Sequence, residues 1–329
     1  MTASSKDHKR HWYRIGYDDT LRNMKKEQQQ KTRSEATADV RKWWDENPFT
    51  LGVATGDYKK HDLVGRQPVE KMDIAYFREI DRRFRKHMGL NVQKPGKPLL
   101  SGVIDFDADI KGKKVLDIAT GSGLHTVEFA AAGAEVTGID LTPFAVMQTK
   151  KNLEARGLSA KVVEMDAQRM DLPADYFDFV NAWGCLMHMP DTEKAMSEIC
   201  RVLKPGGRAF AYMYNRNSWP FWFNIILLRG VLLGGLLRYK GNITRLTSRY
   251  SDGASTGGNM LTKFYTTKQV ESMFRAAGFS KTEAFPLDLG YEADHWPMNS
   301  FPVFKFLPKA VKAWMGKRWG YGLVVWAQK

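Results

Sequence analysis

Residues 115–126 read VLDIATGSGLHT, and this stretch decides the fold. An apolar run that suits a strand ends here in a turn with Gly121 and Gly123, and a helix-like segment follows. Glycine in such a turn lets the backbone bend sharply and approach a ligand closely. A Gly-x-Gly pair alone is weak evidence, so the residues around it have to indicate what the turn binds.

The segments beside this turn alternate between strand-like and helix-like patterns. Short apolar runs occupy 114–119, 135–140, 160–166, 177–183, 208–214 and 321–327. Helical spacing fills several intervals between them; Thr142 with Pro143 marks one helix start, and Asp191 marks another. This alternation predicts an α/β fold with a doubly wound, mostly parallel sheet that helices cover on both faces.

Carboxylates end three of the predicted strands, and they indicate the charge of the ligand. Asp117 would repel the pyrophosphate of a dinucleotide, and Thr126 stands where dinucleotide sites want a third glycine. S-adenosylmethionine (SAM) carries a sulfonium and an ammonium and no phosphate, so a carboxylate suits it. Asp140 could accept hydrogen bonds from both ribose hydroxyls, and Asp166 could accept one from the adenine amino group. Alternatively, Asp140 is an acid at a helix start and Asp166 a solvated loop acid.

Residues 113–215 resemble the SAM-binding core of class I methyltransferases, in particular the small-molecule group related to ubiquinone and menaquinone enzymes. The matching pieces are VLDIATGSG at 115–123, VTGIDLT at 136–142, MDAQRMDLP at 165–173, FDFVNAWGCLMHMPD at 177–191 and RVLKPGG at 201–207. Their order and spacing are jointly very specific. The resemblance implies a seven-stranded, Rossmann-like sheet, SAM as the cofactor and methyl transfer as the reaction.

The resemblance also implies which residues contact SAM. It assigns the methionine part to Asp117, Ala119, Gly121 and Gly123, the ribose to Asp140 with Leu141, the adenine to Asp166 with Ala167, and the surroundings of the methyl group to Trp183. Ala119 departs from the family, which usually has glycine there. Because alanine is small, we expect a slightly tighter loop rather than lost binding.

The candidate catalytic residues are His188 and Tyr214. Methyl transfer from a sulfonium is an in-line displacement, so the enzyme mainly supplies orientation and a dry pocket. A general base is needed only if the nucleophile keeps its proton near neutral pH. His188 follows the fourth strand, where ligands of open α/β folds bind, but it could instead only shape its loop. Tyr214 ends the fifth strand and could touch the acceptor. No metal site is predicted.

The net charge of +14 favours anionic partners, and it is unevenly distributed. Nine Lys/Arg and no Asp/Glu lie at 201–251, and six Lys/Arg and no Asp/Glu lie at 295–329. The rest of the chain therefore sums to −1. Both blocks interleave the charge with aromatic residues, which suits a surface for something anionic and partly apolar. The alternative is a basic surface that only keeps the protein soluble.

We expect three parts along the chain: a flexible polar arm at 1–40, a helical cap at 41–98 and the SAM-binding domain at 99–329. The domain carries an inserted lid at about 216–262 and a basic, aromatic segment at about 295–319. Trp43 and Trp44 are expected to cap the SAM pocket. The sequence shows neither a membrane span nor a secretory signal, which predicts a cytoplasmic protein, free or peripheral to an anionic membrane.

The first hypothesis is a SAM-dependent methyltransferase that acts on a small, largely apolar or lipid-like acceptor, which could be anionic. The positive charge keeps open an RNA methyltransferase, although the place after the fourth strand reads NAWGC, without the prolines common in nucleic-acid enzymes. A third alternative is a non-catalytic protein of the same fold that serves as an adaptor at a membrane surface. The acceptor atom and the oligomeric state stay open.

Overall fold

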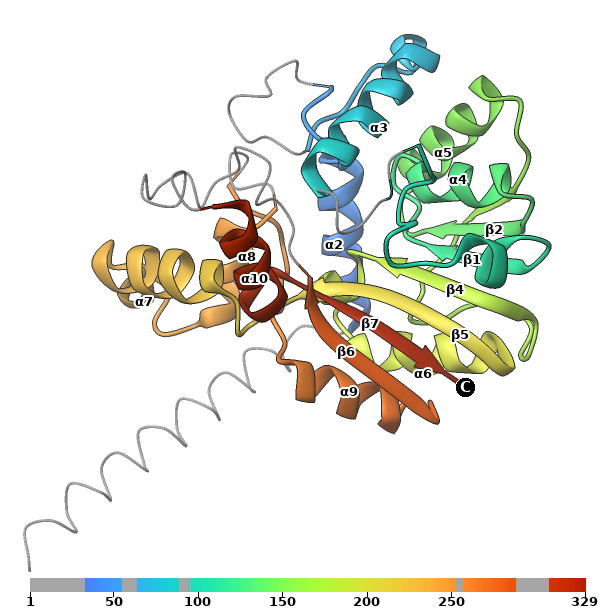
Figure 1. The fold of residues 1–329 in the computed structure, drawn as a ribbon. Coiled ribbons are helices and arrows are strands. Elements are labelled where there is room, and N and C mark those ends of the chain that lie inside the picture. The colour runs from blue at the N-terminus through green and yellow to red at the C-terminus, as the bar shows by residue number, and fades with distance from the viewer. Residues whose placement is uncertain (1–32, 55–63, 89–93, 95, 253–256, 288–307) are drawn as a thin grey trace, which may run out of the picture.

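A computed structural model describes residues 33–54, 64–88, 94, 96–252, 257–287 and 308–329. Its centre is a seven-stranded sheet with the order β3-β2-β1-β4-β5-β7-β6 (Figure 1). The strands are β1 (Lys114–Ile118), β2 (Glu135–Asp140), β3 (Lys161–Glu164), β4 (Phe177–Trp183), β5 (Leu203–Tyr214), β6 (Lys281–Leu287) and β7 (Gly322–Gln328). Strands β1 to β5 pair in parallel, and β7 runs antiparallel to both β5 and β6. The doubly wound, mostly parallel sheet is confirmed.

Helices cover both faces of this sheet (Figure 1). The main ones are α2 (Arg33–Glu46), α3 (Ile74–Met88), α4 (Leu124–Ala131), α5 (Pro143–Ala155), α6 (Thr192–Val202), α9 (Thr267–Ala276) and α10 (Lys309–Trp319). Short helices are η2 (Val69–Lys71), η3 (Phe106–Ile110) and η4 (Leu186–His188). Helices α4 and α5 lie on one face, and α6 and α9 lie on the other. The insertion after β5 forms η5 (Pro220–Leu232), α7 (Gly235–Arg238) and α8 (Ile243–Tyr250).

Local capping explains why the core helices start where they do. The Thr142 hydroxyl accepts a hydrogen bond from the Ala145 amide, and Pro143 occupies the first turn of α5. The Asp191 carboxylate accepts one from the Lys194 amide at the start of α6. Such side chains satisfy amides that a helix start would otherwise leave unpaired, and each stabilises by about 1 kcal/mol. Both helix starts predicted from the sequence are confirmed.

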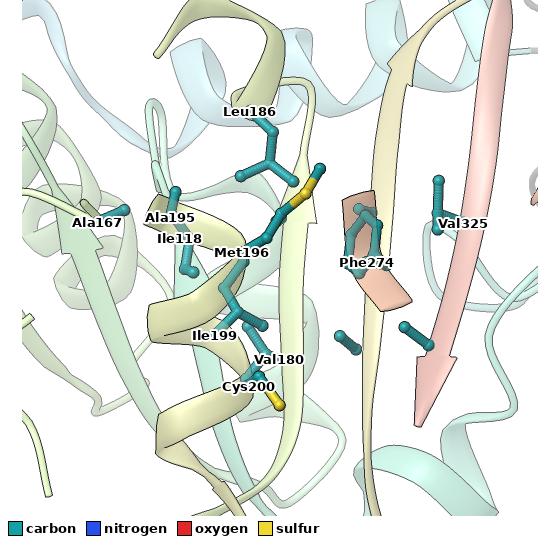
Figure 2. Close-up of a cluster of buried hydrophobic side chains, with 14 of the residues drawn as sticks. Ile118, Ala167, Val180, Leu186, Ala195, Met196, Ile199, Cys200, Phe274 and Val325 are labelled. Carbon is teal, nitrogen blue, oxygen red and sulfur yellow. The ribbon is translucent and has the colours of Figure 1, made fainter. Parts of the chain in front are cut away.

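The face covered by α6 and α9 holds a continuous apolar core (Figure 2). Met196 and Ile199 of α6, Phe274 of α9, and Val180 and Val325 of the sheet are all buried there. Full burial of one large apolar side chain stabilises by about 1.5–3 kcal/mol. This core holds the strands in register and therefore fixes the edge of the sheet at which β1, β2 and β4 end.

The structure changes one boundary from the sequence analysis and adds one strand. Helix α2 begins at Arg33, inside the segment expected as a flexible arm at 1–40; the rest of that arm lies outside the described residues. Strand β6, which the sequence analysis did not locate, completes the sheet beside β7. Of the basic, aromatic segment at 295–319, only 308–319 is described, and α10 fills nearly all of it.

Candidate active site

A cavity of about 400 Å³ opens at the carboxyl ends of β1, β2 and β4. Parts of the chain that are distant in sequence form its walls: the strand ends and loops of the sheet, helix α2 with the segment after it, helix α3 and the insertion after β5. A volume of this size is typical of a small-molecule site. In open α/β sheets, ligands bind at this edge.

The glycine turn forms one wall, and the expected residues divide into two groups. Ala119 and Gly121 line the cavity, whereas Gly123 lies behind it against helix α5. A Cβ on Gly123 would stand 3.0 Å from the Thr149 Cα, so glycine lets the turn pack closely on α5. Ala119 adopts a left-handed backbone with φ 60°, which disfavours alanine and explains why glycine is usual there.

Asp140 joins the glycine turn to the start of α5. Its Oδ2 accepts a hydrogen bond from the Gly121 amide at 3.0 Å. Its Oδ1 accepts from the Thr142 amide at 2.9 Å and from the Thr142 hydroxyl at 3.0 Å. Burial raises the pKa of Asp140, and these hydrogen bonds oppose that effect. Asp140 and the adjacent Leu141 both line the cavity.

Asp117, which the resemblance assigns to the methionine part of SAM, is buried and is not among the residues that line the cavity. One of its oxygens accepts a hydrogen bond from the Thr126 hydroxyl at 2.6 Å, and the other accepts one from the Asn181 amide at 2.7 Å. Burial raises the pKa of Asp117 to about 6. The carboxylate therefore ties β1 to α4 and β4 behind the wall of the cavity.

The loop after β3 contributes Asp166 and Ala167, which line the cavity. Asp166 accepts hydrogen bonds from the amide and the side chain of Gln168, at 2.9 and 3.0 Å. The Gln168 side chain also accepts a hydrogen bond from the Asp191 amide at 2.7 Å. Gln168 therefore couples the end of β3 to the start of α6, a role that the sequence analysis missed.

Aromatic rings form the wall beyond the glycine turn. Trp183 stacks on Tyr212 with ring centroids 4.5 Å apart, and His125 packs edge-on against Trp183 with ring centroids 5.6 Å apart. Burial lowers the pKa of His125 to about 3, so this ring is uncharged at neutral pH. Trp44 of α2 lines the cavity, whereas its neighbour Trp43 packs edge-on against it and does not. The expected pair of capping tryptophans is thus reduced to one.

His188 and Tyr214 both contact Asp252, a residue that the sequence analysis did not select. Asp252 Oδ2 accepts a hydrogen bond from the Tyr214 hydroxyl at 2.7 Å and lies 3.2 Å from His188 Nε2. His188 Nδ1 lies 2.8 Å from the Leu261 carbonyl oxygen. Each ring nitrogen of His188 therefore faces an oxygen of the protein. All three side chains line the cavity.

The insertion places Asp252 in the cavity, and its ionisation depends on its neighbours. Burial raises the pKa of Asp252, but the hydrogen bond and the charge of His188, with the bond from Tyr214, outweigh it and lower the pKa overall. The carboxylate is therefore ionised at neutral pH. One signal could have identified it in the sequence: Asp252 is the sole acidic residue between Glu198 and Glu271.

The charge of the cavity wall is a test of the expected cofactor. Three carboxylates, Asp140, Asp166 and Asp252, line the cavity, and the described lining contains no Lys or Arg. A ligand with a sulfonium and an ammonium fits such a wall. A pyrophosphate would instead face carboxylates, with no Lys or Arg to pair with. The described residues also contain no group of three or more His, Cys, Asp and Glu side chains suited to a metal ion.

Comparisons with known proteins identify the family of this chain. The sequence family described as "Methyltransferase domain" matches residues 115–207. A ubiquinone biosynthesis O-methyltransferase of Pseudomonas syringae pv. tomato is 32% identical over 163 residues, which cover 48% of this chain and 69% of the relative. The chain belongs to the class I SAM-dependent methyltransferases. SAM is the cofactor of this methyltransferase.

Two more relatives extend the comparison. A ubiquinone biosynthesis O-methyltransferase of Coxiella burnetii (strain RSA 331 / Henzerling II) is 27% identical over 166 residues, 50% of this methyltransferase and 70% of the relative. A solved SAM-dependent methyltransferase of Methanosarcina mazei covers 67% of this chain and 93% of its own, with a TM-score of 0.47 and 21% identity.

Proposed function

We propose that this methyltransferase transfers the methyl group of SAM to a hydroxyl oxygen of a small, largely apolar or lipid-like acceptor. The observation that carries the proposal is the Asp252 carboxylate, which the insertion presents to a cavity with largely apolar walls. Leu51, Ile80, Phe84 and Ile225 are among the apolar residues that surround it. The names of the relatives, which are O-methyltransferases, support oxygen as the acceptor atom.

Asp252 is suited to orient a hydroxyl group. Its Oδ2 contacts His188 and Tyr214, and each carboxylate oxygen has two lone pairs that can accept hydrogen bonds. Because Asp252 lines the cavity, its carboxylate can accept a further hydrogen bond from the acceptor O–H. Bound SAM would supply an electrophilic methyl group, and the S–CH₃ electron pair would stay on sulfur, which becomes a neutral thioether. The oxygen forms the O–CH₃ bond, and its proton passes to the Asp252 carboxylate.

In this proposal, His188 and Tyr214 are positioning residues for Asp252. Neither ring nitrogen of His188 is open to a substrate proton, because one faces Leu261 and the other faces Asp252. Burial and the nearby carboxylate raise the pKa of Tyr214 well above its usual value, so its hydroxyl stays a hydrogen-bond donor to Asp252. This arrangement favours Asp252, rather than His188, as the group that orients the hydroxyl and takes its proton.

The cavity favours an acceptor with a neutral head. No Lys or Arg lines its described walls, and His188 is already paired with Asp252, so a negative group inside the cavity would lack a free counter-charge. An acceptor that carries negative charge would have to keep it outside the cavity. The net charge of +14 keeps RNA as a second candidate acceptor, because basic surfaces bind phosphate backbones.

The test of the acceptor class uses SAM with a radiolabelled methyl group, the full chain and a deproteinised cell extract. Label in the organic phase supports the proposal if the labelled methyl group is bound to oxygen, as a methyl ether. Label on nitrogen, sulfur or carbon contradicts the hydroxyl acceptor. Label in RNA that declines steeply with added salt favours the second candidate.

Substitutions of Asp252 and Tyr214 test whether Asp252 orients the acceptor hydroxyl, because unchanged SAM affinity would show that the variant still folds. Asp252→Asn keeps the size of the side chain and should lower methyl transfer about 100-fold, with SAM affinity nearly unchanged. Tyr214→Phe removes one hydrogen bond to Asp252 and should lower transfer less, by about tenfold or under. Full activity of Asp252→Asn would remove the observation on which the proposal rests.

A further inference from the structure

Helix η5 of the insertion has two different faces. Pro220, Asn224 and Ile225 line the cavity from one side of the helix. Trp222 and Val231, on other positions of the same helix, are 48% and 56% exposed. One element therefore contacts the acceptor space and also presents apolar side chains to the outside of the protein.

The exposed apolar surface continues past the end of η5. Leu232 and Leu233 are each 67% exposed, and Leu237 of α7 is 86% exposed. In Figure 1, α7 lies on the opposite side of the molecule from α4 and α5, at the end of a group of helices that projects from the sheet. Large apolar side chains grouped at such a projection mark an interaction site.

The charge beside these leucines indicates the partner. Arg238, Lys240 and Arg245 are exposed, and no described carboxylate forms an ion pair with any of them. Residues 216–251 contain six Lys/Arg and no Asp/Glu. A second copy of this surface would meet it with the same charge, so self-association through it is disfavoured.

We propose that this surface, the docking tip, binds the headgroup region of an anionic phospholipid bilayer. We define the docking tip as Trp222, Leu227, Val231, Leu232, Leu233 and Leu237 together with Arg238, Lys240 and Arg245. The leucines enter the boundary of the acyl chains while the cations contact the lipid phosphates, as in interfacial helices. Among the described residues, no helix has the length and apolar character to cross a bilayer, so the contact is peripheral.

The docking tip would also deliver the acceptor. Because η5 lines the cavity and carries part of the docking tip, a bilayer bound there lies next to the acceptor space. An apolar acceptor could then pass from the lipid to Asp252 without crossing water. This second step rests on the proposed function, whereas vesicle binding itself does not.

The experiment measures flotation of the full chain with vesicles, in the absence of SAM and acceptor. Vesicles of phosphatidylcholine alone are compared with vesicles that contain phosphatidylglycerol. Binding should require the anionic lipid and weaken with added salt. Leu232→Ser/Leu233→Ser/Leu237→Ser should weaken it about 100-fold or more. Arg238→Gln/Lys240→Gln/Arg245→Gln should weaken it by about 100-fold as well.

Two controls match these variants. Lys111→Gln/Lys161→Gln/Lys281→Gln removes the same charge from exposed positions near the starts of β1, β3 and β6, and should bind as the wild type does. Val69→Ser removes an exposed apolar side chain outside the insertion and should also have no effect. Equal loss in the lysine control would show that net charge, and not the docking tip, binds the vesicle.

Other outcomes overturn the inference in distinct ways. Absence of anionic-vesicle binding by the wild type overturns it directly. A wild-type oligomer that the leucine variant converts to a monomer, without vesicle binding, would assign the surface to a protein partner. If vesicles bind as expected but the organic phase gains no label from SAM, the docking tip stands and the proposed acceptor fails.

Discussion

Asp140 stands at the end of β2, where its carboxylate already holds the Gly121 amide and Thr142. We predict that Asp140→Ala lowers SAM affinity by about 10- to 100-fold, because hydrogen bonds to a charged group contribute about 1.5–3 kcal/mol. Isothermal titration calorimetry with SAM measures the change. Thr142→Val is the control for disturbance of this turn, because it removes one donor to Asp140 and the cap of α5 but keeps the carboxylate. An equal loss in both variants would mean that Asp140 only holds the turn.

Asp117 is a buried carboxylate whose ionisation opposes folding. Burial raises its pKa from 3.8 to about 6, so the folded protein binds this proton more tightly than the unfolded chain. The resulting stability is complete below about pH 4 and is lost as the pH rises through about 6. Two pKa units correspond to about 3 kcal/mol. The wild type should therefore lose up to about 3 kcal/mol of unfolding free energy, relative to Asp117→Asn, between about pH 4 and pH 7.5.

Asp117→Asn is a suitable reference because its neighbour can adapt. The Asn181 Oδ1 atom is buried without a described hydrogen-bond partner, and a flip of this amide would turn that oxygen toward Asn at position 117. Urea unfolding of both proteins without SAM, across this pH range, gives the difference. A difference that stays constant with pH would show that Asp117 keeps its proton equilibrium on folding.

At the scale of elements, the close packing of β2 against the glycine turn depends on Gly138. A Cβ at this position would stand 2.7 Å from the Thr120 Cγ2 atom. Gly138→Ala should therefore displace the turn, destabilise the protein by about 1–3 kcal/mol and weaken SAM binding several-fold. Thermal unfolding and SAM titration measure the two effects.

A second substitution separates this clash from other effects of alanine. Thr120→Ser removes the Cγ2 atom and keeps the hydroxyl that accepts a hydrogen bond from Thr149 at 2.9 Å. Gly138→Ala/Thr120→Ser should regain most of the lost stability and affinity. If the double variant is as weak as the single one, the contact with Thr120 is not the cause.

Elements with local signals could be predicted from the sequence, and others could not. The starts of α5 and α6 follow from capping residues next to apolar spacing, which are properties of a few adjacent residues. Strand β6, with the sequence KTEAFPL, is only partly buried and contains a proline, so its apolar alternation is weak. It is a strand because it pairs with β7 along its whole length, which is a contact between distant segments.

At the scale of the whole molecule, the residues that line the cavity could be predicted only in part, because contacts between distant segments decide which side chains reach it. The strand-end carboxylates Asp140 and Asp166 could be placed, because the ends of parallel strands meet at one edge. Asp117 could not, since only the structure shows its oxygens turned to Thr126 and Asn181. Asp252 reaches the cavity because the insertion folds back over the sheet.

Helix α2 closes the cavity from a distant part of the sequence, and SAM binding should therefore stabilise it. The Asp45 carboxylate accepts a hydrogen bond from the Phe144 amide at 3.1 Å, and Gln168 donates one to Thr37 at 3.3 Å. Val40 and Trp44 line the cavity between these contacts. If SAM holds α2 closed, opening of the helix requires release of SAM.

Hydrogen exchange of the full chain measures this coupling. At a SAM concentration of about 100 times Kd, amides of α2 that exchange by this opening should slow by about 100-fold. Helix α9 is the internal control, because it packs against β6 and α6 on the opposite face and contributes nothing to the described cavity lining. Slowing in α9 equal to that in α2 would indicate global stabilisation, and unchanged exchange in α2 would show that the helix does not cover bound SAM.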